Sequence, residues 1–119
     1  MTKNEKIIQE IIKHAHQQGN MTFLAVEKIF SWHGFDFDGN QYPPMTQRAN
    51  MFVWDGWNSE ALDLFKEALD RGQLEAKYCG IVPYLVDGGG LACPLATEVK
   101  DYDEPHWAPV FFNKKGVSR

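Results

Sequence analysis

Long apolar runs are absent from this chain of 119 residues, and no apolar core follows its first residues, Met1–Glu5. A membrane-spanning helix needs about 20 consecutive apolar residues, and a secretory leader needs a shorter apolar core of its own. We therefore predict a cytoplasmic protein that makes no contact with a membrane.

Cysteine is scarce, and positive charge is not in excess. The chain has two cysteines, Cys79 and Cys93, and its 12 lysines and arginines stand against 16 aspartates and glutamates, for a net charge of −4. Two cysteines are too few for a disulfide framework. An acidic balance disfavours a broad surface for nucleic acid but leaves a local basic patch open.

Motifs that carry catalysis or metal binding are missing as well. The glycine cluster Asp87–Gly90 lacks the Gly-Lys-Ser or Gly-Lys-Thr ending of a phosphate loop, and no serine lies in a Gly-x-Ser-x-Gly elbow. His14 and His16 are two positions apart, whereas a helical zinc site uses a pair at i and i+4. We expect no enzyme activity, no metal and no cofactor. The acidic run 101–104 fits a solvated loop, with a small enzyme built on these carboxylates and His106 as the alternative.

Three segments have apolar residues at helical spacing. The first starts near Asn4 and the second near Asn20 or Thr22, at residue types that cap helices well. The third starts after the cap Asn58 and stops at Gly72. These patterns predict three helices in the first two thirds of the chain.

Two apolar runs meet at the glycines of Asp87–Gly90, which is typical of a β-hairpin. The alternating segment 74–78 leads into this hairpin, and a returning strand starts at Leu91. With Gly88 and Gly89 at the turn, Cys79 and Cys93 point to opposite faces of the sheet, so we expect no disulfide.

The whole chain, 1–119, is expected to form a single domain. Its ordered core covers 4–112, a last strand lies within 105–112, and 113–119 is a frayed tail. The predicted fold class is α+β, with three helices followed by a β-hairpin or small antiparallel sheet.

This order of elements resembles that of winged-helix domains, a variant of helix-turn-helix, over roughly Asn4 to Phe112. The resemblance implies a recognition helix at Asn58–Arg71 and a wing tip at Asp87–Gly90. The segment before Asn58 is longer than the short turn that such domains place there. The resemblance to winged-helix domains also implies binding to DNA, as expected of a transcriptional regulator.

The charges at the implied contact positions do not favour phosphate. The third helix carries four acidic residues against two basic ones, and the wing tip holds Asp87 without a lysine or arginine. Phosphate contacts need cations. If DNA is bound, we expect it on another face, which contains Lys6, Lys28 and Arg48.

Aromatic side chains crowd the segment 35–57, between prolines, glycines and polar residues. Either these rings fold back as a small core beneath a long loop, or some stay exposed as a patch for a partner. The residues of the candidate patch are Tyr42, Arg48, Trp54 and Trp57. We therefore expect a module for protein-protein interaction or self-association, with a homodimer as one form and a DNA-binding regulator as the alternative.

Overall fold

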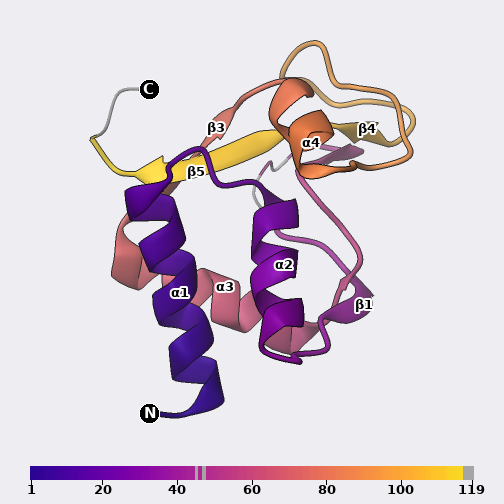
Figure 1. Cartoon of the computed structure of the whole chain (residues 1–119). Coiled ribbons are helices and arrows are strands. Elements are labelled where there is room, and N and C mark those ends of the chain that lie inside the picture. Colours follow the sequence, from indigo (N-terminus) through magenta and orange to yellow (C-terminus); the bar gives the residue numbers. More distant parts are fainter. Residues whose placement is uncertain (45, 47, 117–119) are drawn as a thin grey trace.

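The computed structural model describes residues 1–44, 46 and 48–116 (Figure 1). The chain is an α+β protein, as the sequence predicts. Its elements are α1 (Lys3–Gln17), α2 (Phe23–Trp32), β1 (Asp38–Gln41), β2 (Met51–Phe52), α3 (Ser59–Gly72), β3 (Leu74–Tyr78), α4 (Val82–Asp87), β4 (His106–Trp107) and β5 (Val110–Lys114). In the described part of the chain, no helix is long and apolar enough to cross a membrane.

Each of the three long helices is preceded by a cap residue whose side chain accepts a hydrogen bond from a backbone N–H of the first turn. Thr22 accepts from Ala25 at the start of α2, and Asn58 caps α3, so the predicted cap Asn58 is confirmed. The predicted cap Asn4 is wrong, because Thr2 has the extended backbone of a cap and its hydroxyl accepts the N–H of Glu5.

β3 and β5 form an antiparallel pair, with Leu74 opposite Lys114 and Tyr78 opposite Val110. The strand predicted at 74–78 is therefore confirmed. The other side of β5 is bridged by Met21, whose N–H and C=O exchange hydrogen bonds of 3.0 and 2.8 Å with Phe112. β5 thus lies between Met21 and β3, and α1, α2 and α3 lie below it in the view of Figure 1.

The predicted hairpin at Asp87–Gly90 is wrong, because the residues before it form α4. Pro83 lies in the first turn of this helix, where no N–H is needed, and Gly88 ends it with a left-handed φ of 108°. The strand that pairs with β3 is β5, so the wing tip implied at these glycines is the end of a helix.

The C-terminal prediction needs a second correction. The strand expected within 105–112 is divided into β4 and β5, and β5 continues to Lys114. Asn113 is buried and its Oδ1 accepts the N–H of Asn20 at 2.8 Å, so the chain is not frayed at this point. The end of the predicted tail, 117–119, lies outside the described residues.

Phe23 lies at the centre of the core. Its ring centroid is 5.8 Å from that of Trp54, 5.5 Å from Trp57, 5.3 Å from Phe65 and 5.2 Å from Phe112. These rings come from α2, the segment before α3, α3 itself and β5. One aromatic cluster therefore joins the helices to the sheet.

Candidate interaction surface

The predicted partner residues Trp54 and Trp57 are core residues, exposed by only 4% and 0%. Both indole N–H groups donate to the same oxygen of Glu27, at 2.8 and 2.9 Å. Burying an indole requires a partner for its N–H, and α2 supplies one carboxylate for both. These two tryptophans are therefore corrected from a contact surface to the core.

Tyr42 and Arg48, the other two members of that candidate patch, are exposed. Tyr42 packs edge-on against Phe52, with ring centroids 4.9 Å apart, and lines an apolar cleft of about 480 Å³ between the segment 41–44 and α3. Arg48 is not among the residues that line this cleft. The structure therefore leaves Tyr42 as the exposed aromatic of the predicted patch and does not expose its four members as one surface.

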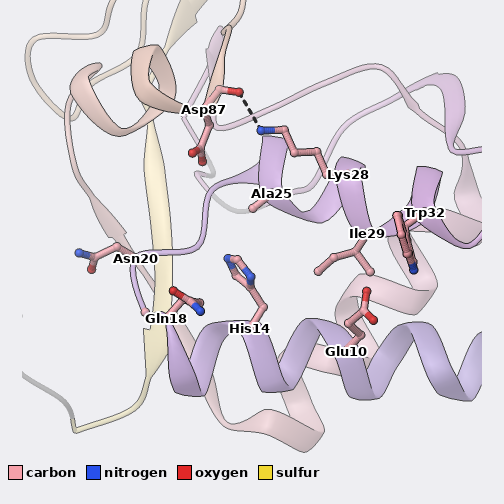
Figure 2. A pocket seen from close by; sticks show the side chains of 10 residues that line it. Glu10, His14, Gln18, Asn20, Ala25, Lys28, Ile29, Trp32 and Asp87 are labelled. Carbon is pink, nitrogen blue, oxygen red and sulfur yellow. Dashed lines mark hydrogen bonds between the residues drawn. The ribbon is translucent and has the colours of Figure 1, made fainter.

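The three basic residues of the alternative nucleic-acid site are also dispersed. Lys6 lines a cleft with Lys13, whereas Lys28 lines a different cleft and donates to the backbone oxygen of Asp87 at 3.1 Å (Figure 2). Arg48 lies in the segment before β2. These residues therefore lie on three different segments and share no cleft among the described residues.

α3, the implied recognition helix, presents mainly negative charge to solvent. Its exposed acidic residues are Glu60, Asp63, Glu67 and Asp70. Arg71 forms ion pairs with Glu67 on the same helix and Glu5 on α1, and its hydrogen bond lowers the pKa of the Glu5 carboxyl. Among the described residues of α3, Lys66 is the remaining cation, so this face repels phosphate.

An apolar surface that sequence reasoning missed lies on α4. Val82, Leu85 and Val86 are exposed by 66%, 64% and 79%. Their spacing of i, i+3 and i+4 places them on one side of the helix, which we name the α4 face. The signal was present in the sequence, since Pro83 suits a helix start and Gly88 a helix end, but the hairpin interpretation assigned these residues to a sheet.

Tyr84 anchors α4 from its opposite side. The ring is fully buried, and its hydroxyl donates to the carbonyl of Val110 at 2.6 Å and accepts the N–H of Phe23 at 3.2 Å. At the end of the helix, Asp87 accepts from the hydroxyl of Thr22. These bonds tie α4 to both α2 and β5, so the α4 face is held outward on a fixed support.

A polar cleft of about 430 Å³ lies between α1 and α2. In Figure 2, Glu10 and His14 point from α1 towards α2, and Trp32 stands at the rim with 83% of its surface exposed. His16 does not share this cleft, because its Nε2 lies 2.8 Å from the carbonyl oxygen of Gly72. Among the described residues, no group of three or more histidine, cysteine or acidic side chains is placed to hold a metal ion.

The acidic run 101–104 connects two distant segments. Asp101 accepts the N–H of Ala49 at 2.9 Å, and the ring of Tyr102 stacks on His106 with centroids 3.9 Å apart. The bond from Ala49 to Asp101, together with a 2.9 Å bond from the Tyr102 N–H to the Ala49 carbonyl, holds the chain before β2 beside the chain before β4. The run is an exposed loop, as the sequence predicts, and Asp101 and Tyr102 attach it to Ala49.

Cys79 and Cys93 are free and half-buried. The argument that they face opposite sides of a hairpin no longer applies, because the hairpin does not form. Burial raises the pKa of the Cys79 thiol from 9.0 to about 11, and burial with the nearby charge of Asp55 raises that of Cys93. Neither thiol has the lowered pKa that nucleophilic cysteines need.

We expect Cys79 in a Cys93→Ala variant to react with iodoacetamide much more slowly in the folded than in the urea-unfolded protein. The shift from 9.0 to about 11 leaves about a hundredfold less thiolate in the folded state. As pH rises, the unfolded thiol loses its proton before the folded thiol does, and this favours the unfolded state. The contribution of protonated Cys79 to stability is therefore complete below pH 9 and is lost by about pH 11. Mass spectrometry of timed samples measures the rates, and equal rates in the two states would contradict this expectation.

The site residues therefore divide into an acidic α3 surface, an apolar α4 face and a polar cleft between α1 and α2. Of the residues expected to contact a partner, Tyr42 and Arg48 stay at the surface. No family model, curated protein or solved structure matches the chain.

Proposed function

We propose that the protein is a non-enzymatic, winged-helix-like module that works through contacts with another protein, with the α4 face as a principal contact surface. The exposure of Val82, Leu85 and Val86 carries this proposal. The free energy falls when a partner removes apolar side chains on one exposed face from water. Because Tyr84 already fixes the helix, little conformational order has to be gained on binding.

The element order supports a winged-helix-like scaffold. α1, the bridge at Met21, α2, α3, β3 and β5 follow one another in the chain, and Met21, β5 and β3 lie side by side as an antiparallel set. The segment between β3 and β5 takes the place of the wing, and it contains α4. On this proposal, the α4 face lies where a winged-helix domain presents its wing.

The charge of α3 favours a protein partner over DNA. The cation Arg71 is paired with two carboxylates, and four acidic side chains are exposed on the same helix. A DNA-binding regulator is the second candidate, since the element order resembles that of DNA-binding domains. It would have to use the dispersed cations Lys6, Lys28 and Arg48.

A photoreactive phenylalanine analogue in place of Leu85 tests the proposal in cells that make the protein. We expect cross-linked protein adducts from position 85 and none from the same analogue at Gln9, an exposed position on α1. Leu85→Asp, combined with the analogue at Val86, is expected to abolish the adducts, because a desolvated carboxylate weakens an apolar contact.

Equal adducts at positions 85 and 9 would contradict the proposal. So would tight retention on duplex DNA that weakens steeply with salt and is lost in Arg48→Ala, since these are the signs of phosphate binding. Retention of DNA by the wild type would favour the second candidate directly.

A further inference from the structure

Among the described residues, no strand pairs with the second edge of β3. The neighbour of β3 in the sheet is β5, and β5 is bridged by Met21 on its far side. Residues 75–78 are all exposed, and among the described residues β3 makes its main contacts only with β5 and α3. An open strand edge is a template for pairing with another strand.

The hydrogen-bond pattern shows which backbone groups face this edge. Gln73 accepts from Lys115 at 2.8 Å, and Cys79 donates to Pro109 at 2.9 Å, at the two ends of the pair with β5. Bonding alternates every second residue in an antiparallel pair, so Glu75 and Lys77 direct their backbone groups towards β5. The N–H and C=O groups of 74, 76 and 78 therefore point outward.

We propose that β3 pairs with β3 of a second copy of this chain, antiparallel, across a two-fold axis at Ala76. This inference rests on the proposed function and names the partner for one of its contacts. In this register, Ala76 of each copy exchanges both backbone bonds with the other, and Leu74 lies opposite Tyr78 of the second copy. The outward backbone groups are then satisfied on both chains.

The side-chain charges select this register. Glu75 lies opposite Lys77 of the second copy, and the symmetry repeats the pair. Both pairs occupy non-hydrogen-bonded positions, where the Cα atoms of facing residues are only about 4.5 Å apart. Opposite charges at such positions stabilise a strand pair.

Neighbouring registers are excluded either by facing like charges or by the direction of the backbone N–H and C=O groups. A two-fold axis at Glu75 places two glutamates opposite each other, and an axis at Lys77 places two lysines there, which destabilises the pair. If the pairing shifts by one residue, a residue whose backbone groups point outward faces one whose groups point towards β5. The hydrogen bonds between the two copies are then lost. Ala76 is thus the centre at which the backbone and the charges agree.

Charge reversals test the pairing by analytical ultracentrifugation at low salt. We expect the wild type to dimerise, and Lys77→Glu and Glu75→Lys each to weaken the homodimer about tenfold, because each creates two like-charge pairs. A mixture of the two variants should form a heterodimer, because one copy then carries two lysines and the other two glutamates. Glu75→Lys with Lys77→Glu in one chain should restore the homodimer.

Two further variants separate pairing from folding. Ala76→Pro removes an outward N–H and leaves the bonds to β5 intact, so it should abolish dimerisation while circular dichroism retains the folded spectrum. Lys13→Glu, an exposed charge reversal on α1, should leave the dimer unchanged. Dimerisation of folded Ala76→Pro with wild-type affinity would overturn the proposal.

The outcomes also separate this inference from the proposed function. A wild type that stays monomeric at high protein concentration, with no heterodimer from the mixed variants, overturns the β3 pairing but leaves adducts at position 85 as evidence for a different partner. A dimer that follows the charge pattern supports the pairing, and an absence of adducts at position 85 then removes only the role of the α4 face.

Discussion

Replacing Phe23 with alanine is expected to lower the free energy of unfolding by about 3–5 kcal/mol. The ring touches Trp54, Trp57, Phe65 and Phe112, so its loss leaves a cavity where four elements of the core meet. A chain of this size is stabilised by only about 5–15 kcal/mol in total. Urea denaturation followed by tryptophan fluorescence and circular dichroism measures the change.

Two control variants isolate the effect of the central ring. Phe23→Leu retains most of the apolar volume and should cost less than Phe23→Ala. Tyr42→Ala removes an aromatic that is 52% exposed and should change stability by about 1 kcal/mol or less. If Phe23→Ala were no more destabilising than Tyr42→Ala, the aromatic cluster would not be the centre of the core.

Glu27→Ala is expected to destabilise the protein by about 2–6 kcal/mol, since it orphans two buried donors and each costs about 1–3 kcal/mol. Its Oε2 accepts from both Trp54 and Trp57, at 2.8 and 2.9 Å, and the variant leaves the two indole N–H groups without an acceptor. The unfolding midpoint in urea measures the loss, and a change in tryptophan emission of the folded state should accompany it.

Glu27→Gln is the matched variant, because its amide keeps one acceptor oxygen at nearly the same position. It should lose less stability than Glu27→Ala. Glu10→Ala on α1, at an exposed carboxylate 3.5 Å from His33, should have a small effect. Equal losses in Glu27→Ala and Glu10→Ala would show that the shared acceptor does not matter.

Helix α3 and strand β3 could be predicted because their signals are local. Asn58 provides the cap, apolar residues follow at helical spacing and the helix reaches Gly72. Residues 74–78 then alternate as a strand does. These signals act between residues that are close in the chain. Neighbouring residues alone are enough to favour one local structure there.

Helix α4 could not be predicted with the same reasoning. Apolar residues before adjacent glycines fit a strand entering a turn, and they fit a short helix ending at glycine equally well. The helix is stabilised by burial of Tyr84, whose hydroxyl bonds to Val110 and Phe23. Both partners are distant in the sequence, so the choice depends on contacts that no local pattern contains.

The residues of the candidate site also divide into those that local sequence predicts and those that depend on contacts between distant segments. The acidity of α3 and the absence of a basic excess were readable from the chain and persist in the structure. The burial of Trp54 and Trp57 depends on Glu27, which lies on another element, and the open edge of β3 depends on its pairing with β5. Sequence alone could place aromatics in that segment without showing which of them face water.

Composition, charge and helical spacing thus decide the α+β class, the three long helices and the acidic character of α3, because each depends on residue types within a few positions of one another. Tertiary structure alone decides that the glycine cluster ends a helix, that the two tryptophans are core, and that the α4 face and the β3 edge are exposed. The physical reason is that burial and strand pairing depend on segments that are far apart in the chain. Those segments compete for the same partners.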